Sequence, residues 1–149
     1  MMMNLLFGLT SMAFCLLLQS LLLASVIRYY TRHGHLVNSP SFGASLVVIS
    51  AVMLMLVIGN LVQVGIWAQL FRILGEFDGF GTAFYHSAVN FATLGYGDIV
   101  MSERHRLLGP LEAINGVLMI GVSTAALMAV FQDVIRKTIK ARHGQGDPF

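Results

Sequence analysis

The segment FATLGYGDI, residues 91–99, determines how this sequence can be interpreted. Thr93 stands before a glycine–tyrosine–glycine triplet that runs from Gly95 to Gly97, and an acid, Asp98, follows. Glycine reaches backbone angles that are closed to other residues, so consecutive carbonyl groups can point in one direction. A ring of such carbonyls can replace the water around a dehydrated monovalent cation. One chain supplies one strand to such a ring, so the segment predicts an oligomeric pore.

The composition places this segment in a membrane protein. Of 149 residues, 56% are hydrophobic and only 11% are charged, which is typical of an integral membrane protein and not of a soluble domain. The net charge of +2 is too small to indicate nucleic-acid binding. Cys15 is the only cysteine, which excludes an intrachain disulfide and a thiolate metal cluster. We expect it to be a small buried or lipid-facing residue.

Three apolar runs are long enough to cross a bilayer as helices, which needs about 20 residues. They extend over residues 5–27, 42–71 and 110–135. A fourth apolar segment, residues 80–92, is too short to cross. Non-helical backbone is tolerated at membrane depth only where protein buries it or a cavity solvates it. We therefore predict a re-entrant helix followed by an extended segment that lines a cavity.

The boundaries of these elements follow from turn and cap residues. Asn38 or Ser39 before Pro40 is a helix-start signal, and GEFDGFG, residues 75–81, is a glycine-rich turn. The chain is accordingly divided into an N-terminal helix with its loop (1–38), a pore domain (39–136) and a basic, unstructured tail (137–149). Polar residues inside the second long helix, such as Gln63, are expected to form packing hydrogen bonds.

Basic residues beside the apolar runs indicate the orientation in the membrane. Arg28 and Arg32 follow the first run, and four basic residues lie in the tail after residue 135. By the positive-inside rule both regions are cytoplasmic. The N-terminus then lies outside, and the glycine-rich segment opens toward the outer side of the cell membrane.

The hexapeptide TLGYGD resembles the T-V-G-Y-G-D filter signature of potassium channels. The order of helix, turn, short helix, filter and helix over residues 41–135 resembles their two-helix pore module. The resemblance implies an all-α membrane protein: three transmembrane helices, a re-entrant pore helix and an extended filter strand, assembled as a homotetramer in lipid. It also implies potassium ions as the permeant species, with no other cofactor.

The resemblance assigns roles to the residues of the filter. Main-chain oxygens of Thr93, Leu94, Gly95 and Tyr96 would bind potassium. The Thr93 hydroxyl would close the innermost site, and Gly97 would set the outer strand angle.

The resemblance also implies residues that support the filter. Asp98 would hydrogen-bond back to the pore helix, where Tyr85 and His86 occupy the places of the family's aromatic residues. Val89 stands where some members have a buried glutamate that bonds the filter aspartate. Glu112 is the only acid between residues 110 and 132, which make up most of the last apolar run. It is either a carboxylate behind the filter that replaces this glutamate or, as we favour, a first-turn acid attracted by the helix N-terminus.

In the last helix the resemblance implies a bend at Gly121 and a water-filled cavity beside Ser123 and Thr124. The filter departs from the family pattern at two places. Leu94 replaces the usual valine or isoleucine, and Ala92 stands where many members have a second threonine. Only the carbonyl of Leu94 would face the ion, so we expect selectivity to survive.

Several titratable residues allow two interpretations. His86 and His105 are expected on the outer side, either as pH sensors or, as we favour, as hydrogen-bonded packing residues. Asp133 could form an inner acidic ring, but we favour an ion pair with Arg136 or Lys137 about one turn away. The histidines show no spacing that is convincing for a metal site.

Three functions fit these observations. The first is a potassium-selective channel, the second a weakly selective cation channel with altered filter support, and the third a non-conducting membrane subunit that keeps the pore fold. An enzyme is not expected, because no nucleophile–base pair, paired carboxylates or phosphate loop is visible. No apolar run has the regularly spaced arginines of a voltage sensor, so the sequence does not indicate the gating stimulus.

Overall fold

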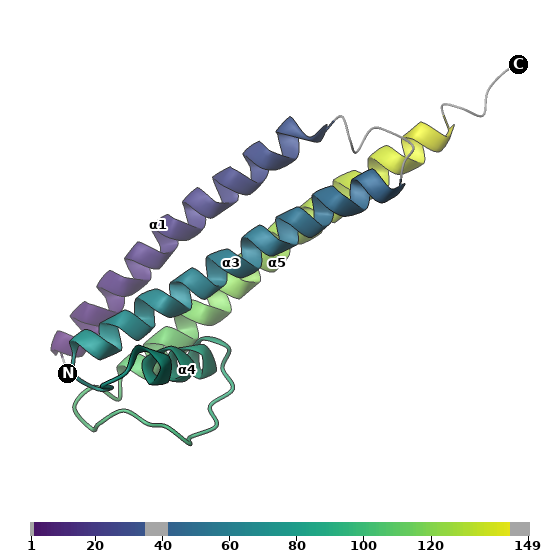
Figure 1. Ribbon diagram of the computed structural model, residues 1–149. Coiled ribbons are helices and arrows are strands. Elements are labelled where there is room, and N and C mark those ends of the chain that lie inside the picture. Colours follow the sequence, from purple (N-terminus) through teal and green to yellow (C-terminus); the bar gives the residue numbers. More distant parts are fainter. Residues whose placement is uncertain (1, 35–41, 144–149) are drawn as a thin grey trace, which may run out of the picture. The chain divides into compact units, whose positions relative to one another are not determined.

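The computed structural model describes residues 2–34 and 42–143, and these residues form helices and turns with no strand. The helices are α1 (Met2–Arg32), α3 (Phe42–Ile73), α4 (Phe80–Phe91) and α5 (Leu108–His143) (Figure 1). Three helices are long and apolar enough to cross a membrane, over Met2–Arg32, Gly43–Ile73 and Leu108–Ile139. The three predicted long helices and the short helix are therefore present.

The long helices extend beyond their predicted ends. α1 continues to Arg32 and α5 to His143, so the expectation of an unstructured tail from residue 137 is wrong up to His143. The reason is local: residues 136–143 contain no glycine or proline, and lysine and arginine are good helix formers. The helix-start signal at residues 38–40 lies outside the described residues.

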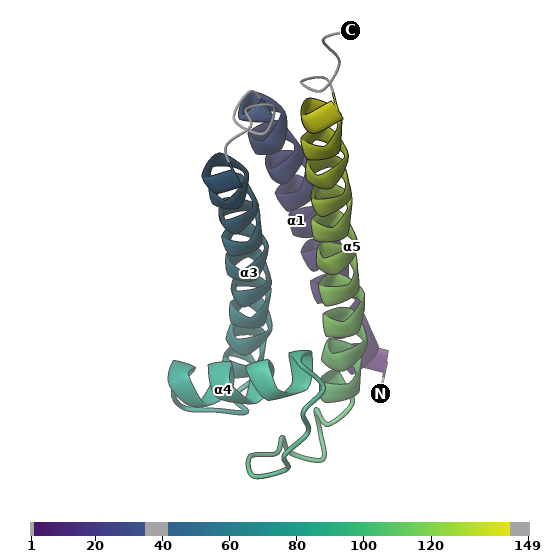
Figure 2. The same ribbon diagram turned by 90° about the vertical axis from the view of Figure 1, so that its right-hand side faces the viewer.

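The chain divides into two compact units. The first comprises the chain up to Ser20 together with Ile58–Gly121, and it contains α4. With 12 residues, α4 is about 18 Å long, well short of the roughly 30 Å hydrocarbon core. Within this unit it crosses the end of α3 and the start of α5 (Figure 2). The buried core of the unit consists of Cys15, Val64, Trp67, Phe71, Phe91, Leu108 and Met119.

Polar contacts also join the helices of the first unit. Gln63 on α3 donates from Nε2 to Oε1 of Gln19 on α1 at 2.7 Å, so the predicted packing hydrogen bond of Gln63 is confirmed. Cys15 is fully buried. This agrees with the buried environment, one of the two that we predicted for it.

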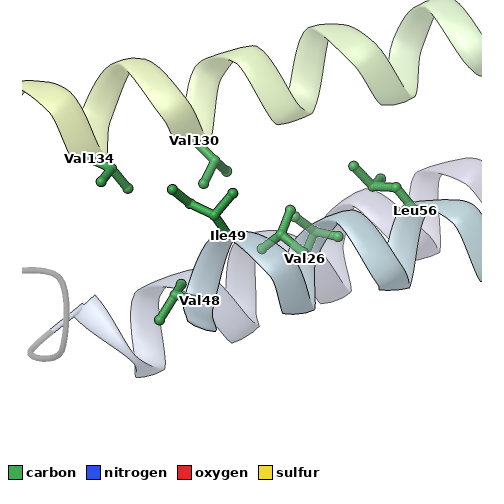
Figure 3. Close-up of a cluster of buried hydrophobic side chains, with 7 residues drawn as sticks. Val26, Val48, Ile49, Leu56, Val130 and Val134 are labelled. Atoms are coloured by element: carbon green, nitrogen blue, oxygen red, sulfur yellow. The ribbon is translucent and has the colours of Figure 1, made fainter. Parts of the chain in front are cut away.

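The second unit comprises Leu21–Val57 and the chain from Val122 onward. Figure 3 shows its buried cluster of apolar side chains from α1, α3 and α5. The cluster consists of Val26, Val48, Ile49, Val52, Leu56, Val130 and Val134. Beside it, Asp133 Oδ2 accepts a hydrogen bond from Tyr30 Oη at 2.6 Å and pairs with Lys137 Nζ at 2.8 Å. The predicted Asp133–Lys137 ion pair is confirmed, whereas the tyrosine contact was not predicted.

Gly116 lies where α5 closely approaches the end of α4. A Cβ atom on Gly116 would lie 2.0 Å from the carbonyl oxygen of Phe91 and 2.9 Å from its Cα. These neighbours are backbone atoms, so no side-chain rotation can make room. A residue without a side chain is therefore required where the two helices touch.

We predict that Gly116→Ala lowers the free energy of unfolding by about 3 kcal/mol, because overpacking outweighs the gain in helix propensity. Thermal unfolding in detergent, followed by circular dichroism, measures this change. Gly81→Ala in α4 is the control, since a Cβ there meets no atom within 4 Å. Equal stability of the two variants would contradict the prediction.

Candidate functional site

The end of α4 sets the direction of the glycine-rich segment. Beyond the C-cap Ala92, the Thr93 N–H donates to the Asn90 carbonyl at 2.9 Å and the Leu94 N–H to the Val89 carbonyl at 2.8 Å. These two bonds form a Schellman motif, whose C′ residue takes the left-handed conformation. Thr93 occupies that place with φ 58°.

The end of α3 contains the same motif with a different residue. The Gly75 N–H donates to the Arg72 carbonyl and the Glu76 N–H to the Phe71 carbonyl, both at 3.0 Å, and Gly75 has φ 75°. Glycine is the usual residue at this position because it has no Cβ. A β-branched residue is a genuine outlier there. Thr93 therefore holds a strained conformation that the chain avoids at the equivalent position of α3.

Left-handed angles recur at every second residue of the segment. Thr93, Gly95 and Gly97 have φ of 58°, 59° and 73°, while Leu94 and Tyr96 between them do not. No heavy atom lies within 4 Å of a Cβ built on Gly95 or Gly97. The two glycines are thus required for their backbone angles and not for space. Among the described residues, Thr93 is the only non-glycine with positive φ.

The side chains of this segment are largely uncovered within one chain. Leu94 is 55% exposed and Tyr96 65%, whereas Val89 on α4 is 7% exposed. Beside the segment lies a hollow of about 430 Å³. Its lining includes Val89, Thr93, Gly95, Gly97, Ile99 and Pro110.

Two side chains of α4 form hydrogen bonds with the residues that follow the Gly95–Gly97 triplet. Tyr85 Oη donates to Asp98 Oδ2 at 2.8 Å, which brings together two residues that the resemblance paired. His86 does not reach Asp98: its Nδ1 lies 2.9 Å from the Ile99 carbonyl oxygen and its Nε2 2.8 Å from Asn90 Nδ2. A carbonyl accepts and an amide nitrogen donates, so His86 is a neutral imidazole protonated at Nδ1. Burial, which lowers the pKa of His86, favours the same form.

A second set of contacts joins the loop after α3 to the loop before α5. Glu76 accepts from the Ser102 N–H at 2.7 Å, from the Ser102 hydroxyl at 2.6 Å and from His105 Nδ1 at 2.5 Å. Burial raises the pKa of Glu76, but these hydrogen bonds outweigh it and leave the pKa below its ordinary value. Asn4 Nδ2 on α1 donates to the Arg104 carbonyl at 2.6 Å. His105 is thus a hydrogen-bonded packing residue, the interpretation that we favoured.

Glu112 does not lie in the first turn of α5 and is fully buried, so the favoured prediction of a first-turn acid is wrong. Its Oε1 contacts the Ser87 hydroxyl on α4, and Ser87 Oγ in turn lies 2.7 Å from the Val64 carbonyl oxygen on α3. The carboxyl group therefore lies against α4. It contacts Ser87 and not Asp98, so it does not replace the acid that is missing at Val89.

Three further predicted residues, Gly121, Ser123 and Thr124, lie on α5. A Cβ on Gly121 meets no atom within 4 Å, Ser123 is buried and Thr124 is exposed. The bend and the water-filled cavity expected around them stay predictions. Within residues 2–34 and 42–143, no group of three histidine, cysteine, aspartate or glutamate side chains is placed to hold a metal ion.

A family model described as an ion channel matches residues 46–133, which is more than half of the chain. The match includes all of α4, the glycine-rich segment and α5 as far as Asp133. No curated protein and no solved structure gave a significant match.

The two Schellman motifs predict opposite effects of exchanging their C′ residues. Thr93→Gly is expected to raise the free energy of unfolding by about 1 kcal/mol, because it removes a left-handed β-branched residue. Gly75→Thr is expected to lower it by about 1 to 2 kcal/mol for the converse reason. Both changes in the free energy of unfolding are measured in detergent. Choline is the only cation present, so bound metal ions do not contribute to the stability. Two variants that shift stability in the same direction would contradict the assignment of strain.

The contacts of Glu76 predict acid-dependent stability. Because its pKa is lower in the folded protein than its ordinary value of 4.5, the unfolded chain binds this proton more readily. The contribution is therefore complete above the unfolded pKa and is lost as the pH falls through the folded pKa. We expect Glu76→Gln to cost about 2 kcal/mol at pH 7, since hydrogen bonds to a charged group are lost.

The difference in unfolding temperature between wild type and Glu76→Gln, measured from pH 7 downward, should shrink below pH 4.5. Glu103→Gln is the control, because Glu103 is exposed and pairs only with Arg106 in the described ion pairs. A difference that is independent of pH would exclude the proposed charge contribution of Glu76.

Proposed function

Because the chain belongs to the ion channel family and is a multi-pass membrane protein, we propose that it is a potassium-selective channel that conducts passively as a homotetramer. Membership of this family points to ion transport and not to catalysis. The proposed filter is the segment from Thr93 to Gly97.

The observation that supports this proposal best is the alternation of backbone angles in that segment. Left-handed angles at Thr93, Gly95 and Gly97 separate ordinary angles at Leu94 and Tyr96. Such alternation rotates successive peptide groups so that their carbonyls align along one edge, which a regular strand does not allow. Rings of aligned carbonyls are what a potassium filter requires. The carbonyls of Thr93, Leu94, Gly95 and Tyr96 would form the ion sites, with the Thr93 hydroxyl at the innermost one.

The electrostatics around the segment favour a cation. The segment begins at the C-terminal end of α4, where a helix has a partial negative charge of about one half. Asp98 follows the last glycine and is oriented by Tyr85. Negative potential would thus be present at both ends of the filter.

The uncovered side chains of Leu94 and Tyr96 support an oligomer. One chain provides one row of carbonyls, and potassium filters are built from four such loops. Side chains that are more than half exposed in one chain would pack against neighbouring copies. We propose that the protein lies in the cell membrane, with the N-terminus outside and the C-terminus in the cytoplasm, as the basic residues indicate.

A weakly selective cation channel is the second candidate, and one observation favours it. Glu112 bonds to Ser87 and is not available to Asp98. Asp98 is bonded on α4 by the exposed Tyr85. Together with Leu94 in place of a β-branched residue, this leaves less support behind the filter.

The reversal potential of purified protein in planar bilayers separates these functions, with potassium on one side and sodium on the other. A value near the potassium limit is expected. A value near zero would support the weakly selective channel. If the protein is silent, cross-linking as four chains would indicate a closed channel, and a different count would support the non-conducting subunit.

We predict that Gly97→Ala abolishes selective conduction but not membrane insertion. A Cβ there meets no atom within 4 Å, so the change acts through the left-handed angle, which costs an alanine about 1 to 2 kcal/mol. The reversal potential measures selectivity, and Gly81→Ala is the control. Potassium selectivity retained in Gly97→Ala would exclude the proposed carbonyl ring.

A further inference from the structure

A carboxyl group lies fully buried in a membrane-spanning helix without a basic partner. Glu112 belongs to the span Leu108–Ile139 and has no solvent exposure. The ion pairs of the described residues do not include it. An isolated carboxylate is very costly in a medium of low dielectric constant, and acids in such places take up a proton or a partner.

The hydrogen bonds around Ser87 identify where that proton would be. Ser87 Oγ lies 2.7 Å from the Val64 carbonyl oxygen and also within hydrogen-bonding distance of Glu112 Oε1. A hydroxyl has one proton to donate, and a carbonyl has none. If Ser87 donates to Glu112, its oxygen faces the Val64 carbonyl with no proton between them. If it donates to Val64, the proton of the second contact must come from Glu112.

We propose that Glu112 is a neutral carboxylic acid that donates its proton to Ser87, which donates its own proton to the Val64 carbonyl. We call this pair of successive hydrogen bonds the relay. It connects α5, α4 and α3 at one point in the first unit. Both contacts at Ser87 are then satisfied hydrogen bonds. No bond to hydrogen is made or broken, because each proton stays on its own oxygen.

The surroundings of the second carboxyl oxygen agree with a neutral acid. By geometry Glu112 Oε2 is buried and forms no hydrogen bond, since the nearby Asn90 amide nitrogen donates to His86 Nε2. In a carboxylate this atom would be an unpaired charged oxygen, whereas in an acid it is an ordinary carbonyl. The titratable group that faces Glu112 from α1 is the Cys15 thiol, and Trp67 on α3 and Asn115 on α5 lie beside that thiol. Neither tryptophan nor asparagine titrates.

The relay makes Glu112 a positioning residue for the proposed filter. Ser87 lies one turn before Phe91, the last residue of α4, and the Schellman motif at that end begins the glycine-rich segment. A shift of α4 along α3 or α5 would therefore move the filter backbone. A glutamine amide can donate from the same place, whereas an aspartate is one methylene too short to reach Ser87.

Infrared spectroscopy of the reconstituted full-length protein at pH 7 tests the proton directly. A protonated carboxyl group has a carbonyl band distinct from those of carboxylates. We expect this band in wild type and in Glu103→Gln, its loss in Glu112→Gln and a frequency shift in Ser87→Ala. A wild-type spectrum without the band, or a band that persists in Glu112→Gln, would overturn the proposal. If Glu112→Gln does not assemble, an unshifted band in Ser87→Ala would overturn it.

Conduction provides the second readout, and this part rests on the proposed channel function. Glu112→Gln is expected to keep the wild-type potassium current, and Glu112→Asp to lose most of it. Loss of current in Glu112→Gln with an intact tetramer would overturn the positioning role. A silent wild type would count against the channel function alone, because the infrared band decides the state of Glu112 without any current.

Discussion

The left-handed conformation of Thr93 is the constraint on which the first unit depends. It ends α4, closes the Schellman motif and turns the chain into the glycine-rich segment. Because α4 stops there, its last carbonyls lie beside α5, and Gly116 is the residue that permits the contact. A change in this one backbone angle would redirect the segment from its first residue.

The conformation persists because contacts on both sides hold the chain. Behind it, Glu112 and Ser87 fasten α4 to its neighbours, and ahead of it Tyr85 and His86 bind Asp98 and Ile99. Strained backbone survives where its surroundings over-determine it, and such strain gathers at functional sites. The contacts of Ser87 with Glu112 and of His86 with Ile99 have buried or half-buried partners, where the electrostatic part of a hydrogen bond is stronger than in water, whereas the Tyr85–Asp98 bond is exposed.

The sequence allowed the helices to be predicted because length and apolarity are local properties. The glycine angles were also predictable, since few residues other than glycine accept positive φ. Thr93 gave no such signal, because its angle follows from the motif and not from the residue. The place of Glu112 in the helix was predicted wrongly: its closeness to Pro110 favours the first turn, whereas its partner Ser87 lies 25 residues away along the chain. The contacts of Glu76 with Ser102 are similarly distant along the chain.

The two Schellman motifs show what the site adds to ordinary helix termination. Both end a helix with the same two hydrogen bonds, and Gly75 accomplishes this without strain. If termination were the only requirement, glycine would serve equally at residue 93 and would remove the strain. A threonine there has one group that glycine lacks and that has a use at a cation site, its hydroxyl. The residue that the fold alone disfavours is thus the one that the proposed innermost ion site requires.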